Sequence, residues 1–209
     1  YTLPFVLHNF YDQAFAFEDG RNDKPNFAAG VVVYTAMRTY FTYKGAILWK
    51  MQAGMGDTIF GPFYQVLKER GVTFHYFHKV ENLHVTGDSI DKISMQVQAT
   101  VTTPGGYQPF QDVKGLPSWP SQPDYTQLKE GKEIQENGYN LESFWTPWPG
   151  VGQKILEAGR DYDMVVLGIS LGAIPYIGRE LIEARTEWQN MVQHVKTIQT
   201  QAFQLWLRP

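Results

Sequence analysis

Cysteine is absent from this sequence of 209 residues. Its absence excludes disulfide bonds, thiolate metal sites and a cysteine nucleophile. It also suits a reducing compartment, so we expect a cytoplasmic location. Positive charge is sparse too: 18 Lys and Arg stand against 21 Asp and Glu, which gives a formal net charge of −3. Because phosphate binding needs a concentrated basic surface, we expect no nucleic-acid partner.

A long apolar run is also missing. The most apolar stretch, residues 27–37, is followed by Arg38 and Lys44, and it falls short of the ~20 apolar residues that a membrane-spanning helix needs. Peripheral contact with a membrane surface stays compatible with this pattern. The first residue is Tyr1, and residues 1–17 read as aromatic, strand-like core sequence. We therefore expect an internal piece of a longer parent, whose N- and C-terminal parts would be its partners.

Aromatic residues are plentiful, with 13 Phe, 12 Tyr and 6 Trp making up 15% of the chain. Each such side chain buries a large area, which suits either a wide apolar cavity or an aromatic-rich core. In the first case residues 27–51 and the loop carrying Trp119, Trp145 and Trp148 would line or cover a substrate cavity. In the second case they are a core helix and a surface loop.

The clearest local pattern is an alternation in which apolar residues point one way and polar residues the other. Its apolar members are Ile93, Met95, Val97, Ala99 and Val101. The pattern predicts a half-buried strand, and the preceding Thr86-Gly87-Asp88 predicts a hairpin with residues 81–85.

The remaining elements follow from periodicity and from breaker residues. We expect one or two helices over 27–51, a helix that follows the turn at 54–57 and runs to Arg70, and helices over 151–158 and 177–195. The helix that ends at Arg70 has Ile59, Phe60, Phe63, Val66 and Leu67 on one face. Further strands are expected at 72–80, 164–169 and 200–207, and a long irregular excursion at 104–149. This order predicts an α/β or α+β fold.

The turn Gly54-Met55-Gly56-Asp57 resembles a dinucleotide fingerprint, in which glycines let a pyrophosphate approach a helix N-terminus. Two features oppose that interpretation. The third glycine, Gly61, comes one position late, and the residues before the turn read as the end of a helix rather than a strand. The alternative is a tight turn that needs small residues.

Residues 168–172 form a Gly-x-Ser-x-Gly pattern between an expected strand and an expected helix, as in the nucleophile elbow of serine hydrolases. Ser170 would be the nucleophile of this alternative function. The downstream partners are three glutamates and His194, all on one expected helix that cannot easily fold back onto the hydroxyl.

Three histidines lie close together in the sequence, at His75, His78 and His84. Residues three apart on a strand point to opposite faces, so the first two cannot share a metal ion. No carboxylate cluster with ligand spacing lies nearby, and we expect partly exposed strand residues and no metal site.

Three segments together resemble flavin-containing amine oxidases, phytoene desaturases and related NAD(P)-binding or FAD-dependent proteins. The first is the glycine turn at 54–56 with the helix and the Gly-Val-led strand up to residue 80. The second is the apolar strand and turn at 161–174, and the third is the tail at 196–207. The resemblance covers most of the chain and is strongest in these segments.

This resemblance implies an FAD cofactor, with Val80 beside the adenine end and Ile169 and Ser170 near the cofactor. It implies hydride transfer from a small apolar substrate to the flavin, and it leaves the catalytic residues unidentified. Amine oxidases have a lysine where this chain has Gln201, and a glutamine cannot act as a cation. A desaturase-like or dehydrogenase-like reaction is therefore expected.

The same resemblance implies a substrate-side lobe at 1–53 and 84–149 and segments of an FAD-binding, Rossmann-like lobe at 54–83 and 150–209. The fingerprint and the C-terminal flavin-contacting segment of the family are missing from the sequence, so we expect this piece alone to be inactive and to hold FAD weakly. A third possibility is a non-catalytic binding module that keeps the fold without the flavin.

Overall fold

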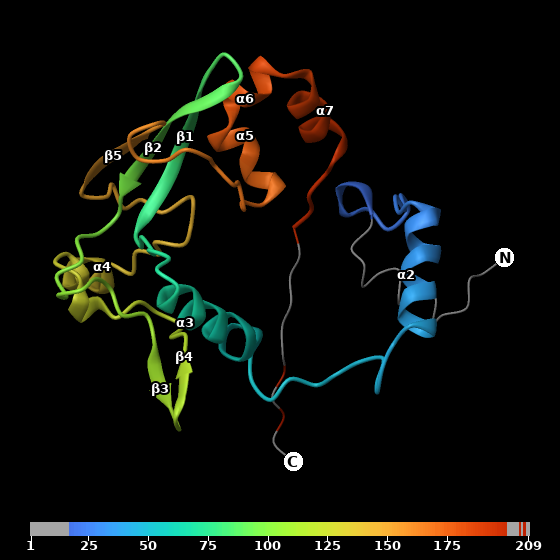
Figure 1. Ribbon diagram of the computed structural model, residues 1–209, viewed down its shortest axis with the longest axis horizontal. Helices are drawn as coiled ribbons and strands as arrows, with labels where there is room; N and C mark the ends of the chain where they lie inside the picture. The colour runs from blue at the N-terminus through green and yellow to red at the C-terminus, as the bar shows by residue number, and fades with distance from the viewer. Residues whose placement is uncertain (1–16, 200–204, 206, 208–209) are drawn as a thin grey trace. The chain divides into compact units, whose positions relative to one another are not determined.

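The computed structural model describes residues 17–199, 205 and 207. Its helices are α2 (Ala29–Phe41), α3 (Gly61–Glu69), α4 (Gly131–Glu136), α5 (Ile174–Ile177), α6 (Arg179–Ala184) and α7 (Thr186–His194). Its strands are β1 (His78–Thr86), β2 (Ser89–Val97), β3 (Gln111–Val113), β4 (Leu116–Ser118) and β5 (Gly152–Glu157). Helices and antiparallel sheets are both present (Figure 1), so the expected mixed α/β class is confirmed. Gln201 and most of the strand expected at 200–207 lie outside the described residues.

The chain divides into two compact units. Unit 1 comprises residues 1–49, 169–175 and 185–209, and unit 2 comprises residues 50–168 and 176–184. Unit 2 contains all five strands together with α3, α4 and α6.

A three-stranded antiparallel sheet, in the order β1-β2-β5, forms the framework of unit 2. Thr86 pairs with Ser89 across the expected Gly87-Asp88 turn, and Gly87 has the positive φ of 60° that such a turn favours. The predicted hairpin is thus confirmed. The predicted strands at 72–80 and 81–85 are wrong as separate elements, because one strand runs from residue 78 to residue 86.

Two local distortions explain why the strand boundaries differ from the prediction. Phe77 has a left-handed φ of 58°, which ends the extended backbone just before β1. An irregularity between Val80 and Asn82 then lets Glu81 remain within the strand without a partner of its own. Val80 consequently lies near the start of β1 and not at the end of a strand.

The predicted helix at 151–158 is wrong, because β5 occupies these residues and pairs with β2 from Lys92–Glu157 to Val97–Gly152. The Gln-Lys-Ile-Leu-Glu sequence has good intrinsic helix propensity. Pairing with the open edge of β2 overrides this preference, since backbone hydrogen bonding and packing outweigh local propensity. Gly159, with a φ of 76°, follows the strand as the expected stop.

The buried parallel strand predicted at 164–169 is also wrong. These residues have no strand assignment, and Met164 and Val166 are 81% and 88% exposed. A continuous apolar run becomes a strand only when neighbouring strands flank it, and none of the described strands pairs with it. The strand required before a nucleophile elbow is therefore missing in front of Ser170.

Helix α3 begins and ends as the sequence predicts. A π-helical turn at Gly56–Phe60 leads into it, and Pro62 occupies its first turn. Gly71 ends it with a φ of 87°, and the next residue, Val72, donates its N–H to the carbonyl of Leu67.

The expected burial of α3 is not observed. Its buried residues are Gly61 and Tyr64, whereas Phe60, Phe63, Val66 and Leu67 are exposed. The ring of Tyr64 packs edge-on against Phe110 and Trp119. Aromatic packing on one side therefore fixes the orientation of this helix, and its more apolar side faces outward.

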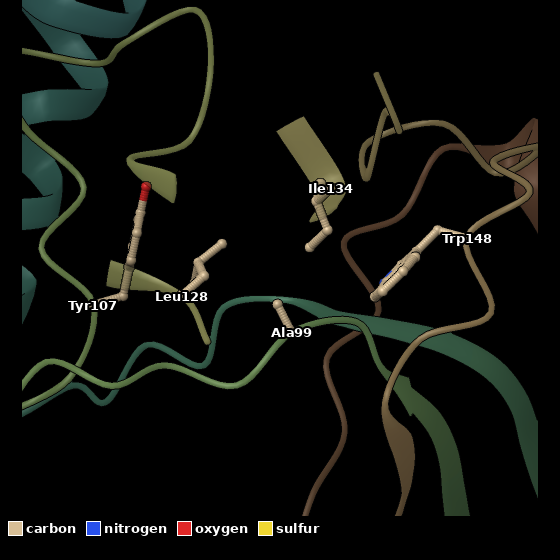
Figure 2. Packing of buried hydrophobic residues seen from close by; sticks show 5 residues of the cluster. All are labelled: Ala99, Tyr107, Leu128, Ile134 and Trp148. Carbon is tan, nitrogen blue, oxygen red and sulfur yellow. The ribbon is translucent and has the colours of Figure 1, made fainter. Parts of the chain in front are cut away.

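The main hydrophobic cluster is Ala99, Tyr107, Leu128, Ile134 and Trp148. Leu128 and Ile134 point into the space beside Ala99, with Tyr107 and Trp148 on either side (Figure 2). All but Ala99 come from the segment 104–149, which was predicted as an irregular excursion. The segment has little regular structure, as predicted, but it supplies a core.

Two predicted long helices are shorter than expected. In the 27–51 stretch only α2 is helical, and none of its residues is buried. The helix predicted over 177–195 is interrupted at Arg185, whose φ and ψ of −140° and 124° are extended. None of the helices among the described residues is long and apolar enough to cross a membrane.

Candidate functional site

Helix α6 lies against β1 (Figure 1). A hydroxyl, an imidazole and a carboxylate meet there. His84 on β1 lies between the other two groups. Its Nε2 atom is 2.7 Å from the Oγ of Ser94 on β2, and its Nδ1 atom is 3.0 Å from Oε1 of Glu180 on α6. We call these three residues the relay. Their order and distances are those of the nucleophile–base–carboxylate arrangement of serine hydrolases.

Strand register brings the relay together. Asn82 and Ser94 are directly opposite across the β1-β2 pair, so their side chains emerge on the same face of the sheet. His84, two residues further along β1, lies on that face as well. Glu180 reaches the same place from α6, which contacts β1.

Glu180 is held by two further donors. The backbone N–H of Val85 donates to Oε2 at 2.9 Å, and Nδ2 of Asn82 donates to Oε1 at 2.7 Å. These two hydrogen bonds, with a smaller contribution from His84, lower the pKa of the Glu180 carboxyl below its ordinary value and outweigh its partial desolvation. The carboxylate is therefore ionised and accepts hydrogen bonds only.

The ionised carboxylate fixes the tautomer of His84. In the neutral imidazole, with Glu180 accepting at 3.0 Å, Nδ1 of His84 carries the proton and Nε2 is an acceptor. The hydroxyl of Ser94 then donates to Nε2 at 2.7 Å. Asn82 Nδ2 also lies 3.0 Å from Nδ1, but both atoms are donors, so its proton points to Glu180. This is the protonation state in which an imidazole acts as a general base.

A pocket of about 500 Å³ lies beside the relay and shares Glu180 with it, and Asn82, which donates to Glu180, lines it too. Its lining combines cations, carboxylates and aromatic rings. The lining residues are Lys79, Glu81, Asn82, Phe144, Tyr176, Arg179, Glu180 and Glu183.

One side of this pocket is built by an aromatic cluster. Phe144 packs against Trp145 and Tyr176, with ring centroids 4.8 and 5.0 Å apart. Nζ of Lys79 lies 4.4 Å from the centre of the Phe144 ring and donates to the Phe144 carbonyl at 3.1 Å. This cation–π contact and hydrogen bond fix the ammonium group at the pocket. The pocket thus offers flat aromatic surface and positive charge side by side.

The residues predicted to contact a cofactor lie in both units. Val80 is half-buried in β1 of unit 2, opposite Met95, and its sequence neighbours Lys79 and Glu81 line the pocket. Ile169 and Ser170 are exposed in unit 1. Ser170 directly precedes a short 3₁₀ turn at Leu171–Ala173. Their roles as cofactor contacts stay predictions.

The Gly54-Met55-Gly56-Asp57 turn is occupied by contacts within the protein. The backbone N–H groups of Asp57 and Thr58 both donate to the Gly54 carbonyl. The Asp57 carboxylate accepts from the backbone N–H of Trp119 at 2.9 Å, and a Cβ added at Gly56 would lie 3.4 Å from the Trp119 ring. These contacts favour the interpretation as a tight turn that needs small residues over a pyrophosphate site.

The histidines near β1 form no metal centre in the part of the chain that the structure describes, where no group of three or more His, Cys, Asp or Glu side chains is arranged to hold an ion. The rings of His75 and His78 are 6.0 Å apart. Nδ1 of His78 lies 2.6 Å from the carbonyl of Tyr76, to which it donates. Burial is the main cause that lowers the pKa of His75.

The sequence predictions did not identify the relay. A regular hairpin closed by Thr86 and Ser89 would place Ile93, not Ser94, opposite Asn82. An irregularity between His84 and Val85 shifts the register by one residue, and a second between Val80 and Asn82 restores it. Because a one-residue shift moves side chains to the other face, Ser94 lies on the same face as His84 only because of the first irregularity. The sequence offered one signal, namely polar residues at alternate positions of β1.

No protein-family model, no curated protein and no solved structure matches the chain.

Proposed function

We propose that the chain is part of a flavin-dependent oxidoreductase of the amine oxidase and phytoene desaturase type. The parent protein would oxidise a small apolar substrate by hydride transfer to FAD. The observation that carries this proposal is the resemblance of three ordered segments to that family. In its support, the first segment has a turn, helix α3 and a glycine stop at Gly71 in the expected order. The strand that follows, β1, begins at His78 and continues beyond Val80.

The pocket beside Val80 suits the adenosine end of a dinucleotide. An adenine ring stacks on flat aromatic surface, which Phe144 and Tyr176 offer. Phosphate groups pair with cations, which Lys79 and Arg179 provide. Glu81 lines the same pocket and is suited to accept hydrogen bonds from ribose hydroxyls, as acidic residues do in other dinucleotide sites.

In this proposal the bound flavin supplies the hydride chemistry, and the chain's own residues bind and orient it. The charged part of FAD is its two phosphates, which adjoin the adenosine that this pocket would bind. The absence of an excess of positive charge in the chain, with its net charge of −3, fits a ligand with two phosphates better than a polyanion. Ile169 and Ser170 remain proposed contacts of the same cofactor.

The test separates the two ends of FAD. Isothermal titration of the 209-residue chain with ADP, FAD and riboflavin should give weak binding of the first two and none of the third. Lys79→Met should weaken ADP binding because it removes a fixed cation. Lys132→Met is the matched control, since Lys132 is exposed on α4 outside the pocket and pairs with Glu136. Failure of ADP and FAD to bind, or equal losses in both variants, would contradict the adenosine site.

The parent protein provides the second test. A purified parent with the yellow flavin absorption supports the oxidoreductase. A colourless parent that binds no added FAD would refute it and would favour the non-catalytic binding module.

A further inference from the structure

We propose that Ser94, His84 and Glu180 form a nucleophilic relay in which Ser94 accepts an acyl group from a small apolar ester. The proposal rests on the geometry of the relay alone, and it does not depend on flavin binding. It also differs from the hydrolase expected from the Gly-x-Ser-x-Gly pattern, because the nucleophile is Ser94 and not Ser170.

The protons in the relay are already arranged for this reaction. The Ser94 hydroxyl donates to Nε2 of His84 at 2.7 Å, and Nδ1 of His84 donates to Glu180 at 3.0 Å. When Oγ attacks the ester carbonyl, its proton passes to Nε2, and the resulting imidazolium is stabilised by the ionised Glu180. His84 then returns the proton to the departing alkoxide, and an acyl–Ser94 ester and a free alcohol result. Water hydrolyses that ester by the same proton transfers.

The carboxylate is held in place independently of the imidazole. The hydrogen bonds that Glu180 accepts from the Val85 N–H and from Asn82 Nδ2 use no atom of His84. A fixed carboxylate holds the ring in one tautomer and one orientation, which is the task of the third member of such a relay.

The relay is accessible, and its surroundings indicate the class of ester. The side chains of His84 and Glu180 are each 37% exposed, and Ser94 is partly exposed. Ile155 of β5 is directly opposite Ser94 and 51% exposed, so it offers apolar surface on the same face of the sheet. A short acyl chain would lie on Ile155.

The position of Ser94 limits the rate. It lies in β2, the central strand, between Asn82 of β1 and Ile155 of β5. In a central strand the backbone N–H groups are used by the ladder, so Ser94 has no free N–H to stabilise an oxyanion. Loss of one such donor costs about 10²–10³-fold in rate elsewhere. We therefore expect slow turnover, and covalent labelling is the better measurement.

The experiment is labelling of the intact chain with a fluorophosphonate probe, followed by mass spectrometry of its peptides. The expected adduct is on Ser94. Ser94→Ala should abolish it, whereas Ser89→Ala, an exposed serine on the same strand, should leave it unchanged. His84→Ala should lower the labelling rate by about 10²-fold or more, because general-base catalysis contributes about that much.

Added imidazole distinguishes a chemical role of His84 from a structural one. If His84 acts as the base, imidazole should restore labelling of Ser94 in the His84→Ala variant. Circular dichroism verifies that this variant is folded. No adduct, an adduct at Ser170 or another site, or a Ser94 adduct whose rate is the same in the folded His84→Ala variant would overturn the proposal.

Discussion

Replacing Glu180 with glutamine tests how much this one carboxylate stabilises the packing of α6 against the β1-β2 hairpin. Glu180 accepts from the backbone N–H of Val85, from Asn82 Nδ2 and from His84 Nδ1 at 2.7–3.0 Å. A glutamine has nearly the same shape but only one acceptor oxygen. Whichever way the amide is turned, its NH₂ group faces at least one donor.

The size of the expected loss of stability follows from the number of hydrogen bonds to Glu180 and from their exposure to solvent. Hydrogen bonds to a charged group contribute about 1.5–3 kcal/mol each when buried. The Glu180 side chain is 37% exposed, so water replaces part of what is lost. We expect the Glu180→Gln substitution to lower the free energy of unfolding by about 1–2 kcal/mol. Glu183→Gln, the same change at an exposed residue of α6, should change it by less than about 0.5 kcal/mol.

The contribution of Glu180 to stability depends on pH in a definite direction. Because the pKa of Glu180 is lowered in the folded chain, its contribution is present above the ordinary glutamate pKa of about 4.3 and is lost as the pH falls through the folded value. The difference between wild type and Glu180→Gln should therefore shrink in acid. Urea unfolding at neutral and acidic pH, together with hydrogen exchange of the Val85 amide, measures both effects. A difference that is absent at neutral pH, or that grows in acid, would refute this account of Glu180.

Three further substitutions test the core and the end of α3. Ile134→Ala should lower the unfolding free energy by about 2–5 kcal/mol in a denaturant titration, because Ile134 is fully buried; a loss below 1 kcal/mol would contradict its place in the core. Trp148→Phe should cost about 1–3 kcal/mol by thermal unfolding, since it leaves the carbonyl of Gln98 without the 2.6 Å bond from Nε1; an unchanged midpoint would argue against that bond. Gly71→Ala should lower the free energy of unfolding by about 1 kcal/mol, because alanine is strained at a φ of 87°. An added Cβ would have no atom within 4 Å, so the backbone conformation is the cause of this loss. Stabilisation measured by calorimetry would contradict the assigned backbone.

The sequence was most informative where local chemistry decides the structure. The Gly87-Asp88 turn, the alternation through Ile93 and Met95, and the glycine stop at residue 71 are set by backbone freedom and by one buried face. The structure confirms the turn and the glycine stop. It confirms the alternating strand as far as Val97, where β2 ends, whereas Gln98, predicted on the wet face, is buried. None requires knowledge of which distant segment lies alongside.

Prediction failed where distant partners decide the structure. Residues 152–157 have helix-favouring side chains and form a strand because β2 offers them an edge. Residues 164–169 are the reverse case, strand-like in composition but without a flanking strand among the described residues. The cluster around Ile134 and Trp148 lies in a segment whose Pro, Gly and Trp content predicts irregular structure. Irregular backbone can still carry core side chains, and periodicity does not reveal them.

The candidate site lay beyond sequence reasoning for the same reason. Val80 was singled out through a resemblance, and the pocket beside it includes Tyr176 and Arg179, nearly a hundred residues away. The relay depends on the register irregularity between His84 and Val85, which the residues of the turn do not predict.

The two proposals share Asn82 and Glu180 and can nevertheless be separated, because each has a residue that the other does not use. Lys79 lines the pocket and does not contact the relay, whereas Ser94 belongs to the relay and does not line the pocket. Lys79→Met should therefore weaken ADP binding and leave fluorophosphonate labelling unchanged, and Ser94→Ala should do the reverse. Glu180→Gln should alter both, since its carboxylate faces the pocket and orients the imidazole. If all three variants changed both measurements equally, loss of folding in unit 2 would explain them, and neither site would be supported.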